Sequence, residues 1–315
     1  MITIQHVFYL VGALFAAWTL LSAFDRTNPK RFGNAAFWGL VALSLLAGHL
    51  LGDVLNGFLV LGLAALATLR LIGRGAPSTG EEERAAAGER NGNRLFLPIL
   101  VVLVTAVAGT LLYLYTPLNQ TGLLEKNRET FILLCLGVLL ALGVIFAWLR
   151  PPPLAPLDEG RRLIDAVGWA AVLPLMLAAL GLVLADTGVG KTIGSLVLTV
   201  IPEGTVLPAV IAFGLGMALF TILTGNAFAA FPVMATAIGV PLLIQTYNGD
   251  PAVVGAIGML AGFCGTLMTP MAANFNLVPA ALLELKDQNG VIKAQIGTAL
   301  PLLVVNILLI YFLAF

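Results

Sequence analysis

The sequence predicts an all-α polytopic membrane protein, and three observations support this fold class. Of the 315 residues, 59% are hydrophobic and 10% are charged, whereas a soluble domain carries about 25% charged residues. The mean hydropathy of +1.00 leaves too few polar side chains to cover a surface that faces water. Apolar runs of about 20 residues, the length of a helix that crosses the hydrocarbon core of a bilayer, recur along the chain.

The same composition excludes several other classes of protein. The continuous apolar runs differ from the alternating strands of an outer-membrane barrel, and the hydropathy excludes a soluble enzyme and a disordered chain. Sixteen Lys and Arg residues balance sixteen Asp and Glu residues, so no net charge indicates a nucleic-acid partner. The two cysteines both lie in apolar runs and the histidines number only two. We therefore expect no metal site and no cofactor.

Six apolar runs before residue 187 predict ordinary membrane helices. They cover residues 4–24, 34–51, 54–72, 95–115, 131–149 and 163–185. The loops after the first, third and fifth runs hold three or four Lys and Arg residues, and the other loops hold none to two. Because Lys and Arg are enriched in cytoplasmic loops, this alternation predicts an N-terminus outside the cytoplasm.

The character of the chain changes near residue 150. Residues 73–94 are polar and rich in Gly and Ala, which predicts a flexible cytoplasmic linker, with a short helix within it as an alternative. The run Pro151-Pro152-Pro153 predicts a stiff connector. After this connector, Gly, Pro, Asn and Thr interrupt the apolar runs. We expect a scaffold-like N-terminal part, residues 1–150, and a transport-like C-terminal part, residues 151–315. With broken or re-entrant half-helices counted, about 9–11 membrane segments result.

Two polar interruptions in the C-terminal half indicate a functional site. The first holds Thr224, Gly225 and Asn226, and the second holds Thr266, Thr269, Pro270, Asn274 and Asn276. Irregular backbone at membrane depth is tolerated only where it is buried in protein or lines a wet cavity. Paired broken helices indicate the binding site of a secondary transporter.

The residue types in these interruptions suit a small anion and a coupling ion. The stretch from residue 192 to 285 contains no Lys or Arg, but free N–H groups at the N-terminus of a half-helix can bind a carboxylate. Glu203 is a candidate for carrying a proton or pairing with Lys191, and an interfacial turn is an equally good interpretation of it. Glycines such as Gly258 and Gly262 also serve close helix packing.

Two long motifs in this half resemble a bacterial membrane family. The first is Gly225-Asn-Ala-Phe-Ala-Ala-Phe-Pro-Val233, and the second runs from Gly262 to Lys286 and contains Gly-Thr-Leu-Met-Thr-Pro. The family is catalogued only as a domain of unknown function, number nine-seven-nine, and the likeness covers most of the chain. The resemblance implies a multi-pass protein of the bacterial inner membrane, encoded beside a second small membrane protein.

The resembled family is grouped with the ion-transporter superfamily, which includes dicarboxylate, gluconate, lactate and citrate permeases. By resemblance, residues 224–226 match the tip of one re-entrant hairpin and residues 266–276 the tip of another. The Ser-Asn-Thr triplet of such tips is absent, and Thr-Gly-Asn stands in one place. The chain is shorter than full-length carriers, which favours one subunit of a split transporter or a homo-oligomer.

Together these patterns predict a permease, or a permease subunit, that moves a small carboxylate-type anion with a proton or sodium gradient. We expect that the protein is not an enzyme. A membrane metalloprotease needs His-Glu-x-x-His, which is absent, and Asp165 and Asp186 would lie about 30 Å apart on one helix, too far for a dyad. The alternative is a non-transporting scaffold or assembly partner of another membrane protein. The lack of a charged ring disfavours a channel.

Overall fold

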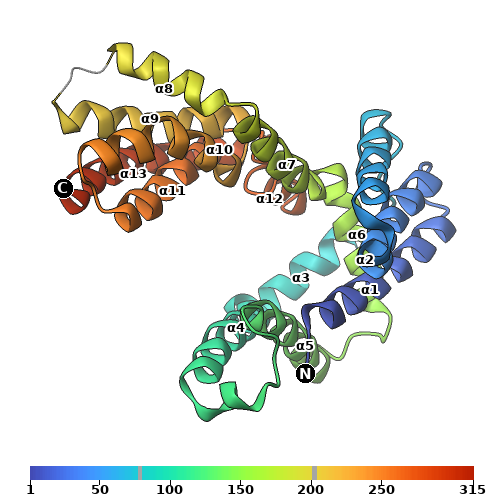
Figure 1. Ribbon diagram of the computed structural model, residues 1–315. Helices are drawn as coiled ribbons and strands as arrows, with labels where there is room; N and C mark the ends of the chain where they lie inside the picture. The colour runs from blue at the N-terminus through green and yellow to red at the C-terminus, as the bar shows by residue number, and fades with distance from the viewer. Residues whose placement is uncertain (77–79, 201–203) are drawn as a thin grey trace. The chain divides into compact units, whose positions relative to one another are not determined.

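The computed structural model describes residues 1–76, 80–200 and 204–315, and within these ranges the protein is helical and contains no strand. Figure 1 shows the helices in chain order. The predicted all-α polytopic class is confirmed. The chain forms two compact units, Met1–Asp165 and Ala166–Phe315.

Seven helices of the described ranges are long and apolar enough to cross a membrane. They are Ile4–Phe24, Arg31–Thr68, Glu82–Tyr115, Glu129–Leu149, Val206–Thr224, Ala227–Thr246 and Gly290–Ala314. A further apolar helix, Pro251–Thr266, is shorter. The sequence predicts about 9–11 segments because it counts broken or re-entrant half-helices in the C-terminal half, two helices within Arg31–Thr68 and another at 163–185.

The first unit begins with a long helical hairpin and ends with an amphipathic helix. Its helices are α1 (Ile4–Phe24), α2 (Arg31–Thr68), α3 (Glu81–Asn91), α4 (Leu97–Tyr115), α5 (Glu129–Leu149) and α6 (Ala155–Val167). Helix α3 lies in the stretch predicted as a flexible linker, where an Ala- and Glu-rich composition favours a helix. Helices α4 and α5 pack closely: a Cβ on Gly137 would lie 2.9 Å from the backbone oxygen of Val102.

Helix α2 is folded back on itself at Gly52. This residue has φ 68° and ψ 172°, a conformation that glycine adopts far more readily than other residues. The two legs lie side by side, because a Cβ on Gly62 would lie only 3.1 Å from Leu40 Cδ1. At the end of the two legs that lies away from Gly52, Asn34 and Gly73 exchange two hydrogen bonds of 2.8 Å. The two runs predicted at 34–51 and 54–72 are these two legs.

A buried polar cluster joins α6 to the first two helices. Asp165 is 4% exposed and accepts a 2.8 Å hydrogen bond from Trp38 Nε1 of α2. Arg161, one turn earlier on α6, donates to Asp25 at 2.5 Å and to Asp165 at 3.4 Å. Trp18 of α1 donates to a backbone carbonyl of α6 at 2.9 Å. The compact units therefore divide at residue 165, whereas the sequence placed the boundary at the proline run near 150.

The two aspartates of this cluster have opposite pKa shifts. Burial raises the pKa of Asp25, but hydrogen bonds from Thr27 and the guanidinium of Arg161 outweigh burial and hold the pKa below its ordinary value of 3.8. Burial raises the pKa of Asp165 above that value, although Trp38 donates to it and Arg161 lies nearby. Ionisation of Asp25 therefore favours the folded state, and ionisation of Asp165 opposes it.

The second unit contains the helices on either side of both polar interruptions. They are α7 (Leu173–Asp186), α8 (Val189–Val200), α9 (Val206–Thr224), α10 (Ala227–Met234), α11 (Pro251–Thr266), α12 (Leu277–Leu282) and α13 (Gly290–Ala314). A π-helical stretch, Ala235–Thr246, continues α10. It contains Pro241, whose missing N–H disturbs regular α-helical hydrogen bonding.

The run at 163–185, predicted as one spanning helix, is broken in the structure. Helix α6 ends at Val167, Gly168 has φ 56°, and α7 begins at Leu173. A glycine with positive φ commonly ends a helix. Asp165 and Asp186 therefore lie on different helices, and the predicted single span was wrong.

The core of the second unit forms where small residues let α9 and α11 approach. Phe213 and Met217 of α9 are fully buried. A Cβ on Gly258 would lie 2.5 Å from the Phe213 ring, and one on Gly262 would lie 2.8 Å from Met217 Cε. Close approach through small residues is typical of helix packing in membranes. This packing holds the C-terminal ends of α9 and α11 together, and the chain breaks at both of these ends.

We predict that Asp25→Asn destabilises the protein by about 1–3 kcal/mol at neutral pH, because it removes a charged partner of the largely buried guanidinium of Arg161. The folded-state pKa of Asp25 lies below 3.8, so its contribution is present above the unfolded pKa and is lost as the pH falls through the folded one. Thermal unfolding in detergent should show a Tm difference from the parent protein that shrinks below about pH 4.

Asp186→Asn is the matched control for this prediction, because Asp186 is exposed. We expect Asp186→Asn to leave the Tm unchanged within the error of the measurement, both at neutral pH and below about pH 4. A Tm difference for Asp25→Asn that stays constant with pH would contradict the assigned role of the Asp25 carboxylate.

Candidate functional site

The first break separates α9 from α10. Gly225 follows Thr224 with φ 73°, a left-handed conformation that suits glycine. Asn226 then caps α10: its side-chain oxygen accepts a 2.8 Å hydrogen bond from Phe228 N, and its carbonyl oxygen accepts from the next two amides at 3.1 Å. The chain therefore changes direction while the first amides of the new helix are satisfied.

The second break occupies residues 267–276, between α11 and α12. Asn276 is fully buried. Its side-chain amide donates to the carbonyl oxygens of Thr266 at 2.8 Å and Thr269 at 2.7 Å. A carbonyl group at a helix end has no partner within the helix, and water is scarce at membrane depth. Asn276 therefore supplies the partners that the end of α11 lacks.

The two breaks lie against each other in the second unit. Thr269 is buried and donates its hydroxyl to the carbonyl oxygen of Ile222, near the end of α9, at 2.9 Å. A Cβ on Gly225 would lie only 2.5 Å from the backbone oxygen of Met271, so the two backbones are in direct contact. The structure gathers six of the eight predicted site residues here, namely Thr224, Gly225, Asn226, Thr266, Thr269 and Asn276.

Two buried oxygen atoms in this region have no hydrogen-bond partner among the described residues. They are Asn276 Oδ1 and Thr221 Oγ1. Thr221 lies one turn before the end of α9, and a Cβ on Gly262 of α11 would stand 3.3 Å from its hydroxyl. A buried oxygen left unsatisfied costs about 1–3 kcal/mol. Both atoms are therefore suited to bind a donor or a cation from outside the chain.

A small pocket opens beside the second break, between α11 and α13. Its volume is about 260 Å³, and its lining residues are Leu260, Phe263, Cys264, Thr266, Leu267, Phe275, Leu302 and Asn306. Asn306 is 4% exposed and lies 3.5 Å from Cys264 Sγ through its side-chain amide. A mostly apolar wall with a few polar groups is typical of small-molecule sites, and this volume suits a ligand of few heavy atoms.

Three other predicted site residues are not part of this buried contact between the two breaks. Pro270 and Asn274 are exposed, although their neighbours Thr269 and Ala273 are buried. Glu203 lies outside the described residues. The sequence also predicts free N–H groups at a half-helix N-terminus, whereas in the structure Asn226 already binds the first amides of α10.

Two polar residues of this region were not among those predicted. Asn306 is the only amide in the last apolar run, residues 298–315, and a polar residue inside a membrane helix is a functional candidate by default. That signal was available in the sequence. Thr221 gives no such signal, because a helical threonine ordinarily bonds to a carbonyl group of the preceding turn.

Comparison with known proteins identifies a family. Residues 5–315 match the family described as "Protein of unknown function (DUF979)". The chain belongs to this family. The DUF979 match spans both compact units, which agrees with the resemblance that the two motifs predicted. Neither the curated proteins nor the solved structures give a match to the chain.

We predict that Gly225→Ala destabilises this DUF979 protein by about 2–4 kcal/mol, because the added Cβ strains a left-handed backbone and meets the oxygen of Met271. Gly188→Ala is the control: Gly188 has φ 77°, and an added Cβ there meets nothing within 4 Å. Gly188→Ala should lower the free energy of unfolding by about 1–2 kcal/mol, the cost of a side chain in a left-handed backbone conformation. Thermal unfolding of the two variants measures the difference, and equal losses would contradict the close approach of the two breaks.

Proposed function

We propose that this DUF979 protein is a secondary transporter, or one subunit of one, for a small organic anion. It would work in the bacterial inner membrane, with its N-terminus outside the cytoplasm, and use a proton or sodium gradient. It would belong with the organic-anion permeases of the ion-transporter superfamily, with which the family that the two sequence motifs resemble is grouped.

The observation that carries the proposal is the contact between the two helix breaks. Two interrupted apolar helices meet through Thr269 and Gly225 inside the second unit. Broken helices that meet at membrane depth are the arrangement by which transporters expose backbone groups to a substrate. Ordinary packing needs no such interruption, since continuous helices satisfy their own backbone hydrogen bonds.

The site offers dipoles for an anion in place of basic side chains. No Lys or Arg occurs between residues 192 and 285, so a carboxylate here would depend on N–H groups. Its oxygen can replace that of Asn226 at Phe228 N, where the N-terminus of α10 carries a partial positive charge. The amide of Asn226 would then donate a second hydrogen bond to the same carboxylate.

The pocket between α11 and α13 would hold the remainder of the substrate. Its walls include Phe263 and Phe275, whose ring centroids lie 6.4 Å apart, and its polar end includes Asn306. Sodium favours uncharged and charged oxygen ligands, as other hard cations do. Asn276 Oδ1 and Thr221 Oγ1, which lack partners in the described protein, are candidate ligands for it, and Glu203 is the candidate carrier for a proton.

We predict that Asn226→Ala and Asn274→Ala each reduce uptake at least tenfold without unfolding the protein. The measurement is uptake of labelled lactate, gluconate, succinate and citrate by proteoliposomes, under a sodium or proton gradient, with and without the membrane protein encoded beside this one. Asn119→Ala, an exposed asparagine of the α4–α5 connection, is the matched control and should transport normally.

Normal uptake by both Asn226→Ala and Asn274→Ala would refute the site. If Asn226→Ala fails and Asn274→Ala transports normally, the site is confined to the buried contact and its rim at Asn274 takes no part. The absence of uptake in every combination, including the chain with its partner protein, would overturn transport in favour of a scaffold or assembly role.

We further predict that a bound substrate raises the Tm of the purified protein. A ligand at about one hundred times its Kd stabilises the folded state by about 2.7 kcal/mol. The same four carboxylates, each tested with and without sodium, should give a shift for one of them. A shift that needs sodium would identify the coupling ion, and the Asn226→Ala variant should lose the shift.

A further inference from the structure

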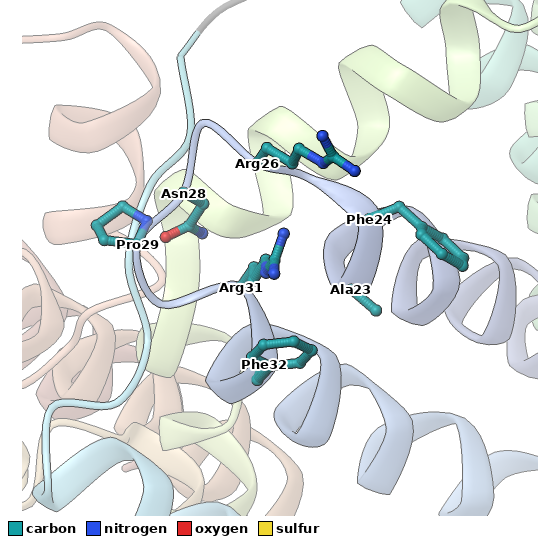
Figure 2. Close-up of a pocket in the computed structure, with 7 residues that line it drawn as sticks. All are labelled: Ala23, Phe24, Arg26, Asn28, Pro29, Arg31 and Phe32. Atoms are coloured by element: carbon teal, nitrogen blue, oxygen red, sulfur yellow. The ribbon is translucent and has the colours of Figure 1, made fainter.

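The turn between α1 and α2 forms an open pocket of about 880 Å³ in the first unit. It is lined by Ala23, Phe24, Arg26, Asn28, Pro29, Arg31 and Phe32. Figure 2 shows these side chains around the turn, with the guanidinium groups of Arg26 and Arg31 beside the same hollow. The proposed transport site in the second unit uses none of these residues.

The backbone of this turn is held in place by side-chain hydrogen bonds. Asn28 is 2% exposed. Its amide donates to the carbonyl oxygen of Gly73 at 3.0 Å, and its oxygen accepts from Lys30 N at 2.9 Å. Asp25 accepts from the amide and the hydroxyl of Thr27 at 2.9 and 2.6 Å. These hydrogen bonds fix the backbone of the turn, and the fixed backbone sets the spacing between Arg26 and Arg31.

Both guanidinium groups of the pocket are available to a ligand. Neither Arg26 nor Arg31 makes an ion pair or side-chain hydrogen bond within the described ranges, and Arg31 lies 4.7 Å above the ring of Phe32. Asp25, the acidic residue that precedes Arg26 in the sequence, is already paired with Arg161 at 2.5 Å. Two unpaired positive charges thus flank a pocket whose lining contains no acidic side chain.

The position of the turn places the pocket at a membrane surface. Helices Ile4–Phe24 and Arg31–Thr68 are both long and apolar enough to cross a bilayer, and the turn joins them directly. Phe24 is 79% exposed and Phe32 is 68% exposed. They lie at the ends of these apolar helices, where large apolar side chains reach the acyl chains and basic groups reach the headgroups.

We propose that this pocket binds the phosphate of an anionic phospholipid. The guanidinium groups of Arg26 and Arg31 would donate paired hydrogen bonds to its oxygens, the geometry that arginine forms with phosphate. Phe24 and Phe32 would contact the glycerol and the first methylene groups of the lipid. A free phosphate ion shares the headgroup chemistry but leaves both exposed rings without a partner, so the apolar rim favours the lipid.

The test measures lipid binding to the purified full chain in detergent. The probes are dioleoyl phosphatidylglycerol, dioleoyl phosphatidylcholine and inorganic phosphate, with affinity followed by native mass spectrometry and by Tm. The double variant Arg26→Gln, Arg31→Gln removes both charges from the pocket. The matched control, Lys126→Gln, Arg128→Gln, removes two exposed charges from the loop before α5. A second variant, Arg26→Lys, Arg31→Lys, keeps the charge.

We expect phosphatidylglycerol to bind more tightly than phosphatidylcholine. The Arg26→Gln, Arg31→Gln variant should bind phosphatidylglycerol about thirtyfold more weakly than the parent protein, because two basic residues contribute about this much at an anionic surface. The affinity of the control for phosphatidylglycerol should stay within about twofold of the parent protein, and the lysine variant should lose less affinity than the glutamine variant.

Equal binding of the two lipids, or equal losses of affinity in the glutamine variant and the control, would overturn the proposal. Inorganic phosphate that displaces phosphatidylglycerol at equal concentration would overturn the lipid assignment. If the glutamine variant fails to fold, binding of the two lipids to the parent protein and to the lysine variant tests the proposal, and equal binding of the two lipids would again overturn it.

Discussion

A helix that ends inside a membrane must find partners for its last carbonyl groups within the protein, because water is scarce there. Asn276 meets this constraint for α11 by donating to Thr266 and Thr269. Thr269 in turn donates to the end of α9. These hydrogen bonds allow two apolar helices to stop within the second unit, and the pocket of the candidate site lies beside the end of α11.

Charge is distributed unequally between the two units, and each distribution suits its surroundings. In the first unit Arg161 lies between Asp25 and Asp165, so its charge is compensated at short range on both sides. This cluster lies at the end of α1, outside the long apolar helices, where the cost of burying charge is smaller than in hydrocarbon. The second unit has no Lys or Arg from residue 192 to 285, and the polar groups at its two breaks are neutral amides, hydroxyls and backbone atoms.

Most of the candidate site could be predicted from residue types alone. Asn, Thr, Gly and Pro are costly in apolar helices, so the interruptions at 224–226 and 266–276 stand out against their neighbours. The contribution of Asn306 could have been found in the same way. Which residues face inward could not be predicted, since Asn276 is buried while Asn274, two positions earlier, is exposed. Within an irregular segment no periodicity relates sequence position to direction.

The sequence by itself determined the membrane class, the positions of both breaks and the family, because each depends on composition or on local motifs. Only the tertiary structure decided that the two breaks touch, that the two legs of α2 pack against each other, and that α6 packs on α1 and α2 through Asp165 and Arg161. These features depend on contacts between residues far apart in the chain, such as Trp38 and Asp165. Hydropathy averages over neighbouring residues, so it carries no information about such pairs.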